Sequence, residues 1–263
     1  MNNNSKLRLA FYELEKQYRP YFDFFVENQE KYNEFRGGVT IDGYLNFEPE
    51  LLLLGYNPAH GKYREWQYND AHLVNQGERP FGCFERWNAR KNGNWWELNK
   101  PINNVFPANI VELLYRYTEL IGGNPERDTN KWPHWASNIE ERIMKLNLYP
   151  FGTEDGKRLQ TMFEKLTLDP SAPGHSSYKE EWDVRRHFVH LLHQFISGYV
   201  KPKCIICFGK STMSDFTYGQ FKEIEEGIFV SDTYTNVVGI SRKGTWTSRV
   251  GMAAELAAAI VSK

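Results

Sequence analysis

The stretch that decides the fold is Leu51-Leu52-Leu53-Leu54-Gly55-Tyr56-Asn57-Pro58. Four consecutive leucines that end abruptly at a glycine and a proline are typical of a short strand buried on both faces. Such strands occur in parallel sheets whose two faces are covered by helices. The residues after the leucines should then lie at the carboxyl end of a core strand.

Outside this stretch, the chain alternates between short apolar runs and segments with helical spacing. The predicted strands are residues 51–54, 143–148, 204–208 and 236–240, and the predicted helices between and after them are 109–120, 156–166, 181–199 and 249–261. Residues 7–32 predict two further short helices, interrupted at Pro20. Strands joined by helical crossovers predict a three-layer α/β/α domain around a mainly parallel, four-stranded sheet. We expect residues 1–263 to form a single domain, in which residues 1–50 are an N-terminal helical extension.

Composition limits the class of protein. The chain has 263 residues, of which 41% are hydrophobic and 15% aromatic, enough for one large core. No run of apolar residues approaches the length of a membrane span, and the first residues lack the pattern of a secretory signal. Three cysteines argue against a disulfide framework, and Cys204 and Cys207 should face opposite sides of one strand. We therefore expect a cytoplasmic protein with no membrane partner.

The net charge of −1 excludes a chain that is basic throughout. A local basic face remains open, because cations cluster at two places. These are Lys201, Lys203 and Lys210 around one predicted strand, and Arg242, Lys243 and Arg249 after another. Such clusters are either solvated surface or a site for nucleic-acid phosphates.

Two asparagines follow predicted strands. Asn57 comes after the leucine run, and Asn147 stands at the end of the second run. Ligands of parallel sheets bind beyond the carboxyl ends of the strands, and an amide can both donate and accept hydrogen bonds. Aromatic residues near both asparagines would complete a slot for a planar heterocycle; they are Tyr56, Phe81, Tyr149 and Phe151. The alternatives are a local turn at Asn57 and ordinary core positions for the aromatic rings.

The order of these motifs resembles that of the uracil-DNA glycosylases, and most closely the single-strand-selective monofunctional branch. The matching segments are the Leu-Leu-Gly-Tyr-Asn-Pro turn ending at Pro58, the Arg-Pro-Phe-Gly segment at 79–82 and the Leu-Asn-Leu-Tyr-Pro segment at 146–150. The resemblance covers most of the chain from about residue 51 onward. Each motif is short, so its specificity comes from the shared order and spacing.

The resemblance implies a role for each matching residue. Asn57 would orient the hydrolytic water, Phe81 would stack on a flipped base, and Asn147 would bind the pyrimidine edge. Gly55, Tyr56 and Pro58 would line the same substrate-binding turn. The implied reaction is hydrolysis of the N-glycosidic bond of a uracil-like or damaged base in DNA, with no metal or cofactor.

The chain departs from the family where a His-Pro-Ser loop is expected after the last strand. Residues 238–246 contain no histidine and instead include Ser241 and Arg242. These two residues are candidate substitute donors to the base, with Trp246 as a wedge into DNA, unless the segment is a simple basic loop. His60 follows the first turn and is either an acid or base in the pocket or a solvated loop residue.

Three further histidines, His187, His190 and His193, have a spacing that spreads them around a helix rather than along one metal-binding face.

The leading hypothesis is a base-excision glycosylase or a divergent derivative of one, with single- or double-stranded DNA as its partner. The rival is a catalytically inactive module that binds a nucleobase, nucleotide or nucleic acid in the same pocket. A hydrolase of free nucleosides is the third hypothesis, and it predicts no affinity for polymers.

Overall fold

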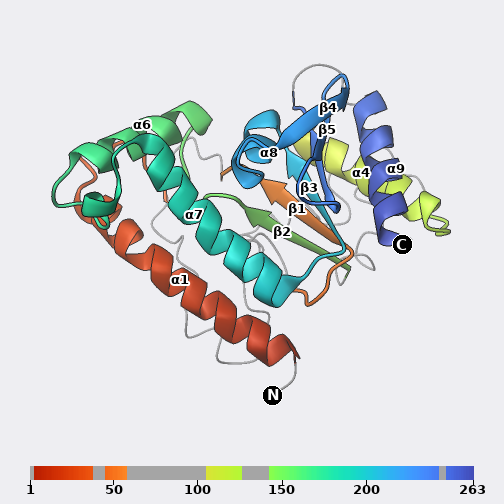
Figure 1. Cartoon of the computed structure of the whole chain (residues 1–263), viewed down its shortest axis with the longest axis horizontal. Helices are drawn as coiled ribbons and strands as arrows, with labels where there is room; N and C mark the ends of the chain where they lie inside the picture. Colours follow the sequence, from red (N-terminus) through yellow and green to blue (C-terminus); the bar gives the residue numbers. More distant parts are fainter. Residues whose placement is uncertain (1–2, 38–44, 58–104, 126–141, 243–246) are drawn as a thin grey trace, which may run out of the picture. The chain divides into compact units, whose positions relative to one another are not determined.

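The computed structural model of the chain describes residues 3–37, 45–57, 105–125, 142–242 and 247–263 (Figure 1). The helices are α1 (Asn3–Glu27), α4 (Val105–Leu120), α6 (Gly156–Leu168), α7 (Glu181–Phe195), α8 (Lys210–Phe216) and α9 (Thr247–Val261), with the short helices η2 (His175–Ser177) and η3 (Ile196–Val200). The strands are β1 (Leu51–Gly55), β2 (Ile143–Asn147), β3 (Cys204–Phe208), β4 (Phe221–Glu225), β5 (Ile228–Ser231) and β6 (Val237–Ile240). The four predicted strands are confirmed at β1, β2, β3 and β6, and the α/β class with them.

The strands form one mixed sheet in the order β2-β1-β3-β6-β5-β4. β1 pairs in parallel with β3, and β3 with β6. Two backbone bonds, from Glu50 N to Arg142 O and from Leu148 N to Gly55 O, follow the same chain order, so β2 is parallel to β1 as well. β5 is antiparallel to both β6 and β4. The expectation of a four-stranded sheet is therefore wrong, because a hairpin adds two antiparallel strands in the described part of the chain.

Contacts between residues divide the chain into two compact units. Among the described residues, unit 1 comprises 3–37, 45–47, 55–57 and 146–201, and unit 2 comprises 48–54, 105–125, 142–145, 202–242 and 247–263. The single-domain organisation of residues 1–263 stays a prediction.

The core of unit 2 lies between the sheet and the helices α4 and α9, which run side by side (Figure 1). Alternate residues of each strand face this core, as the two-residue period of a strand requires, and Cys204 and Ile206 of β3 are examples. On the opposite face, Met213 of α8 lies over Gly239 of β6, where a Cβ atom would be 3.0 Å from the Met213 Cγ. Helices therefore cover both faces of the sheet. Cys207, which is also buried, falls outside the α4/α9 core, so the two cysteines face opposite sides, as predicted.

In unit 1, α1 packs along α7 (Figure 1). The prediction of two short helices here is wrong, because α1 continues through Pro20 without a break. A proline inside a helix removes one backbone hydrogen bond, but Pro20 lies on the exposed side, where water can solvate the freed carbonyl group. The buried side carries apolar and aromatic residues on either side of Pro20, which hold the helix together by tertiary packing.

An aromatic cluster fills unit 1, with Phe151 at its centre. The Phe151 ring is fully buried, and its centroid lies 4.8 Å from that of Phe188 in α7 and 5.0 Å from that of Phe22 in α1. Edge-to-face and tilted pairs dominate, which is the arrangement that the quadrupoles of aromatic rings favour. The segment that follows β2 is therefore anchored between two helices.

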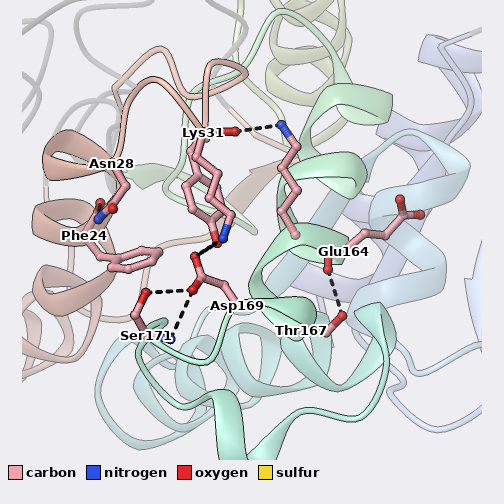
Figure 2. A network of polar contacts seen from close by, with 9 residues as sticks. Phe24, Asn28, Lys31, Glu164, Thr167, Asp169 and Ser171 are labelled. Carbon is pink, nitrogen blue, oxygen red and sulfur yellow. Dashed lines mark hydrogen bonds and ion pairs between the residues drawn. The ribbon is translucent and has the colours of Figure 1, made fainter.

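Asp169, just after α6, joins the same unit through a polar network (Figure 2). Its carboxylate accepts hydrogen bonds from Lys31 Nζ at 2.6 Å, Tyr32 Oη at 3.0 Å and Ser171 Oγ at 2.7 Å. Burial alone would raise the pKa of Asp169, but these donors outweigh burial and hold the pKa below its ordinary value. Nearby, Lys165 pairs with the buried Glu34 at 2.8 Å. The turn after α1 is thus tied to the end of α6.

The amino ends of β1 and β2 are joined by a second network, in unit 2. Arg142 donates two hydrogen bonds to Glu50, at 2.9 and 2.7 Å, and Tyr117 Oη donates a third at 2.7 Å. Burial opposes ionisation of Glu50, but the donors hold the pKa of its carboxyl group below the ordinary value. A satisfied ion pair closes this end of the two strands, whereas ligands of parallel sheets bind beyond the carboxyl ends.

Among the described helices, none combines the length and apolarity needed to cross a membrane.

Candidate functional site

The carboxyl ends of β1 and β2 lead into two segments that stay side by side. Leu148 N donates to Gly55 O at 2.8 Å, and Tyr149 N donates to Tyr56 O at 2.9 Å. The parallel pairing therefore continues beyond both strands. It brings the turn that carries Asn57 next to the segment that begins at Asn147, as we expected from two strands that end at one edge of a sheet.

Asn147 is a buried amide at this edge, with only 6% of its surface exposed. Within the described residues, its Nδ2 atom is buried and has no hydrogen-bond partner. Burying an amide without a partner costs ~1–3 kcal/mol, and few such groups occur in native proteins. An acceptor supplied by a ligand would remove this cost.

Gly55 provides the space in which the Asn147 amide lies. A Cβ atom on Gly55 would come within 2.7 Å of Asn147 Oδ1, closer than non-bonded atoms approach. Glycine at this position therefore reflects a close approach between the end of β1 and the Asn147 side chain.

Replacing Gly55 by alanine should displace the Asn147 amide and lower the free energy of unfolding by ~1–3 kcal/mol, the usual cost of overpacking a buried site. Chemical denaturation measures the change. Gly198→Ala is the matched control, because a Cβ atom there would have no neighbour within 4 Å. Equal stability of the two variants would contradict the close approach.

Asn57 is held by the segment that follows β2. Its Nδ2 atom donates to Thr153 Oγ1 at 2.9 Å and lies 3.3 Å from the carbonyl oxygen of Phe151. Thr153 is fully buried. The Asn57 amide is therefore anchored through its nitrogen. Sequence reasoning missed Thr153, although its place shortly after a predicted strand was a signal that could have pointed to it.

The aromatic residues near the asparagines take mostly core positions. Tyr149 and Phe151 are fully buried, so for these two rings the alternative interpretation, ordinary core residues, is the one the structure supports. Tyr56 is 9% exposed and packs edge-on against Tyr149, with ring centroids 5.1 Å apart. Its ring also covers Gly156, where a Cβ atom would lie 3.3 Å from Tyr56 Cε1. An aromatic slot built from Tyr149 and Phe151 is therefore wrong.

Ser241 and Arg242 follow β6 in unit 2. The Ser241 backbone N–H donates to Gly227 O at 2.7 Å, which fixes the start of the segment. Arg242 is an exposed residue whose aliphatic stem passes Gly209, where a Cβ atom would lie 3.7 Å from the Arg242 Cδ. Gly209 has a φ of 108°, a conformation that side chains rarely adopt. Arg242 therefore lies beside the carboxyl ends of β3 and β6, and partial burial lowers the pKa of its guanidinium group.

Arg249 makes a structural contact of its own. Only 11% of its side chain is exposed, and it donates to the Glu226 carbonyl at 3.0 Å and to the Glu226 carboxylate at 2.6 Å. It secures the turn of the β4–β5 hairpin, where Gly227 has a φ of 75°. Of the two alternatives left open for Arg242, Lys243 and Arg249, a shared basic face is therefore not supported for Arg249.

Several predicted site residues lie outside the described residues. They are Pro58, His60, Phe81, Lys243 and Trp246. The structure thus brings together the segments of Gly55, Tyr56, Asn57 and Asn147, and it places Ser241 and Arg242 at the end of another strand.

His187 of α7 is partly buried among aromatic rings. His187 packs against Tyr21 and Tyr178, with both ring centroids at 5.8 Å, and its partial burial together with nearby His190 lowers its pKa. Over the parts of the chain that the structure describes, no group of three or more metal-binding side chains is assembled.

Neither a scan of protein-family models nor a search of curated proteins finds a match for this chain. The resemblance to uracil-DNA glycosylases therefore rests on the short motifs and on the positions of their residues at the strand ends.

Proposed function

We propose that this chain is a DNA base-excision N-glycosylase, or a divergent derivative of one, that hydrolyses the N-glycosidic bond of a uracil-like or damaged base. The observation that carries the proposal is the buried Asn147 amide, whose nitrogen has no acceptor among the described residues. The ring carbonyl groups of a pyrimidine are acceptors of the right kind. Enzymes that act on extruded bases read them through hydrogen bonds of this type.

Asn57 supports the choice of an enzyme over a simple binder. Its amide is oriented by Thr153 and lies on the segment next to the one that begins at Asn147. An amide oxygen accepts a hydrogen bond from water, and a water molecule fixed in this way is the nucleophile that hydrolysis needs. In this proposal Asn147 selects the base and Asn57 positions the water.

The second candidate, a binding module without catalysis, is favoured by a different observation. The chain contains no histidine after His193, so the segment after β6 has no imidazole to stabilise a departing base anion. Loss of one preorganised donor lowers the rate by a factor of about 10² to 10³. In the proposed enzyme, Ser241 and Arg242 would supply donors in its place, and release of unmodified uracil would be slow.

A panel of oligonucleotides tests the two candidates directly. Single- and double-stranded substrates carrying uracil or other altered bases are incubated with the full chain, and abasic sites are then cleaved with alkali. Strand scission at one class of lesion supports the glycosylase. Salt-sensitive binding without scission across the panel supports the binding module, and base release from free nucleosides without binding to polymers would indicate a nucleoside hydrolase.

Arg242→Ala should weaken binding to oligonucleotides and flatten the dependence of binding on salt by about one unit of log–log slope, as the loss of one phosphate contact does. Fluorescence anisotropy at several salt concentrations measures both effects. Lys222→Ala is the control, because Lys222 is also an exposed cation in unit 2 but lies on the edge strand β4. An Arg242 variant with the wild-type slope would exclude a phosphate contact by this residue.

A further inference from the structure

The segment that connects α6 to α7 in unit 1 is fixed at both ends. Asp169 holds its start through a polar network, and the Asp183 carboxylate holds its end by accepting from two backbone N–H groups, at 2.9 and 3.1 Å. Within residues 170–180, only Ala172 and Tyr178 are buried. The middle of the segment, which includes η2, is therefore held by these two side chains, and Tyr178 is the larger and the polar one.

Tyr178 is bonded to both long helices of unit 1 through two further side chains. The hydroxyl groups of Tyr178 and Tyr21 are hydrogen-bonded to each other, and Tyr21 Oη lies 3.4 Å from His187 Nε2. Tyr21 belongs to α1 and His187 to α7, which pack along each other (Figure 1). Both tyrosines are buried. We call Tyr178, Tyr21 and His187 the tyrosine–histidine cluster.

The hydrogens of the tyrosine–histidine cluster can be placed from the chemistry of its groups. Each hydroxyl group carries one hydrogen, and a buried hydrogen needs an acceptor. If Tyr178 donates to Tyr21, then Tyr21 donates to His187 Nε2, and both hydrogens have acceptors. In the reverse order, the hydrogen of Tyr178 would have no acceptor in the described part of the chain. The satisfied arrangement therefore requires a neutral His187 with no hydrogen on Nε2.

A protonated His187 does not fit this arrangement. An imidazolium carries hydrogen on both nitrogen atoms, so Nε2 becomes a donor. Tyr21 then has to accept from His187 and give its own hydrogen to Tyr178, whose hydrogen loses its acceptor. A buried donor without an acceptor costs free energy. Protonation of His187 therefore weakens the contact that holds Tyr178.

The groups around His187 determine where it titrates. Burial lowers the pKa of His187, and the nearby His190 of the same helix lowers it further. From other elements, Tyr21 and Tyr178 face the imidazole, and burial raises the pKa of each, so both stay neutral. Among the described residues, no charged side chain of α6 contacts His187, and η3 carries no charge. The charge of the cluster near neutral pH is therefore set by its histidine.

We propose that the tyrosine–histidine cluster is a pH-sensitive latch: neutral His187 holds residues 170–180 against α1 and α7, and protonation of His187 releases them. This inference does not rest on the proposed glycosylase activity. In the released state His187 takes up its proton near the ordinary pKa of about 6.5, before the latched state does. The stabilisation of the latched state is therefore complete above about pH 6.5 and is lost as the pH falls toward the lowered pKa.

Hydrogen exchange in the full chain tests the latch. Four N–H groups of the segment donate to backbone carbonyl groups, those of Ala172, His175, Ser177 and Tyr178. After correction for the intrinsic effect of pH on exchange, their protection should fall by about 10-fold between about pH 8 and about pH 5, as expected when one buried hydrogen bond is lost. The amides of β3, in unit 2, should keep their protection and serve as the internal reference.

Three variants separate the latch from other causes. In His187→Gln the segment should stay protected at both pH values, because glutamine does not ionise and its side-chain oxygen can accept from Tyr21. In Tyr21→Phe the protection should already be about 10-fold lower at about pH 8, because the middle of the cluster is missing. His175→Gln is the control, since His175 lies in the segment but outside the cluster, and it should respond to pH as the wild-type chain does.

An NMR titration gives a second readout. The Cε1–H signal of His187, identified by its loss in His187→Gln, should titrate below about pH 6.5 in the wild-type chain. In Tyr21→Phe its midpoint should rise, because protonation no longer leaves a hydroxyl hydrogen without an acceptor.

The latch is overturned if the wild-type segment is equally protected at both pH values, or if His187→Gln keeps the wild-type response. It is also overturned if His175→Gln abolishes the response, or if Tyr21→Phe changes neither the protection at about pH 8 nor the His187 midpoint. A parallel loss of protection in β3 would mean that the whole chain unfolds in acid, and it would overturn local release too.

Discussion

Asn57→Ala is expected to lower the rate of base release by a factor of about 10² to 10⁴. This is the usual effect of removing a side chain that accepts a proton from a nucleophile or orients it. The variant should bind oligonucleotides nearly as well as wild type, because it loses the group that orients water and no contact to phosphate. Single-turnover cleavage of the preferred lesion measures the rate, and anisotropy measures the binding.

Asn236→Ala is a suitable control for this variant. Asn236 is also partly buried and also donates its amide to a backbone carbonyl, that of Pro202 at 3.2 Å, but it precedes β6 and so lies at the amino end of its strand. Its replacement should leave cleavage unchanged. Robust base release by Asn57→Ala would show that the chemistry depends on other residues.

The sequence predicted the central strands well because they are buried on both faces. β1 and β3 read as continuous apolar runs bounded by glycine or proline, and no helix pattern competes with them. The hairpin of β4 and β5 was missed because β4 is an exposed edge strand. Four of its five residues are exposed and three are charged, so its pattern resembles that of a loop. Gly227, in the turn, was the one available signal.

Sequence position alone also misjudged Pro20 and Arg249. The rule that proline ends a helix assumes that local hydrogen bonds decide, whereas in α1 the apolar side on both flanks of Pro20 is buried and tertiary packing prevails. Arg249 is close to Arg242 in sequence, but the first turn of α9 directs it to the Glu226 turn. Nearness along the chain does not predict whether two charges share a surface.

The positions of the candidate site residues were predictable from the sequence, but their hydrogen-bond partners were not. That Asn57 and Asn147 lie at the same edge of the sheet follows from the apolar runs before them and from the topology of parallel sheets. Their partners do not follow, because the bond from Asn57 to Thr153 depends on the adjacency of β1 and β2, and nothing in the local sequence encodes that adjacency. The orientation of an amide is a property of the assembled unit.

Asp169 of unit 1 accepts three side-chain hydrogen bonds, so its replacement should lower stability. Asp169→Asn keeps the size of the side chain but removes its charge and turns one acceptor into a donor. The variant cannot accept all the bonds from Lys31, Tyr32 and Ser171, and the Tyr32 hydroxyl group is buried. We expect the free energy of unfolding at neutral pH to fall by ~2–4 kcal/mol, as when one partner of a buried, charge-assisted network is removed. Denaturation with urea measures the loss.

The pH dependence of unfolding distinguishes this charge effect from a packing effect. Because the pKa of Asp169 is lower in the folded chain than its ordinary value of about 4, the unfolded chain takes up the proton first as the pH falls. The stabilisation by Asp169 is therefore complete above about pH 4 and is lost as the pH falls further toward the lowered pKa. Asp169→Asn should show a shallower loss of stability in this acid range than the wild-type chain.

Asp23→Asn serves as the control, because Asp23 is 54% exposed and lies 3.9 Å from Arg19, a surface pair whose removal costs ~0–1 kcal/mol. If Asp169→Asn and Asp23→Asn gave the same denaturation midpoint at neutral pH and the same acid dependence, the Asp169 network would contribute no more than a surface ion pair.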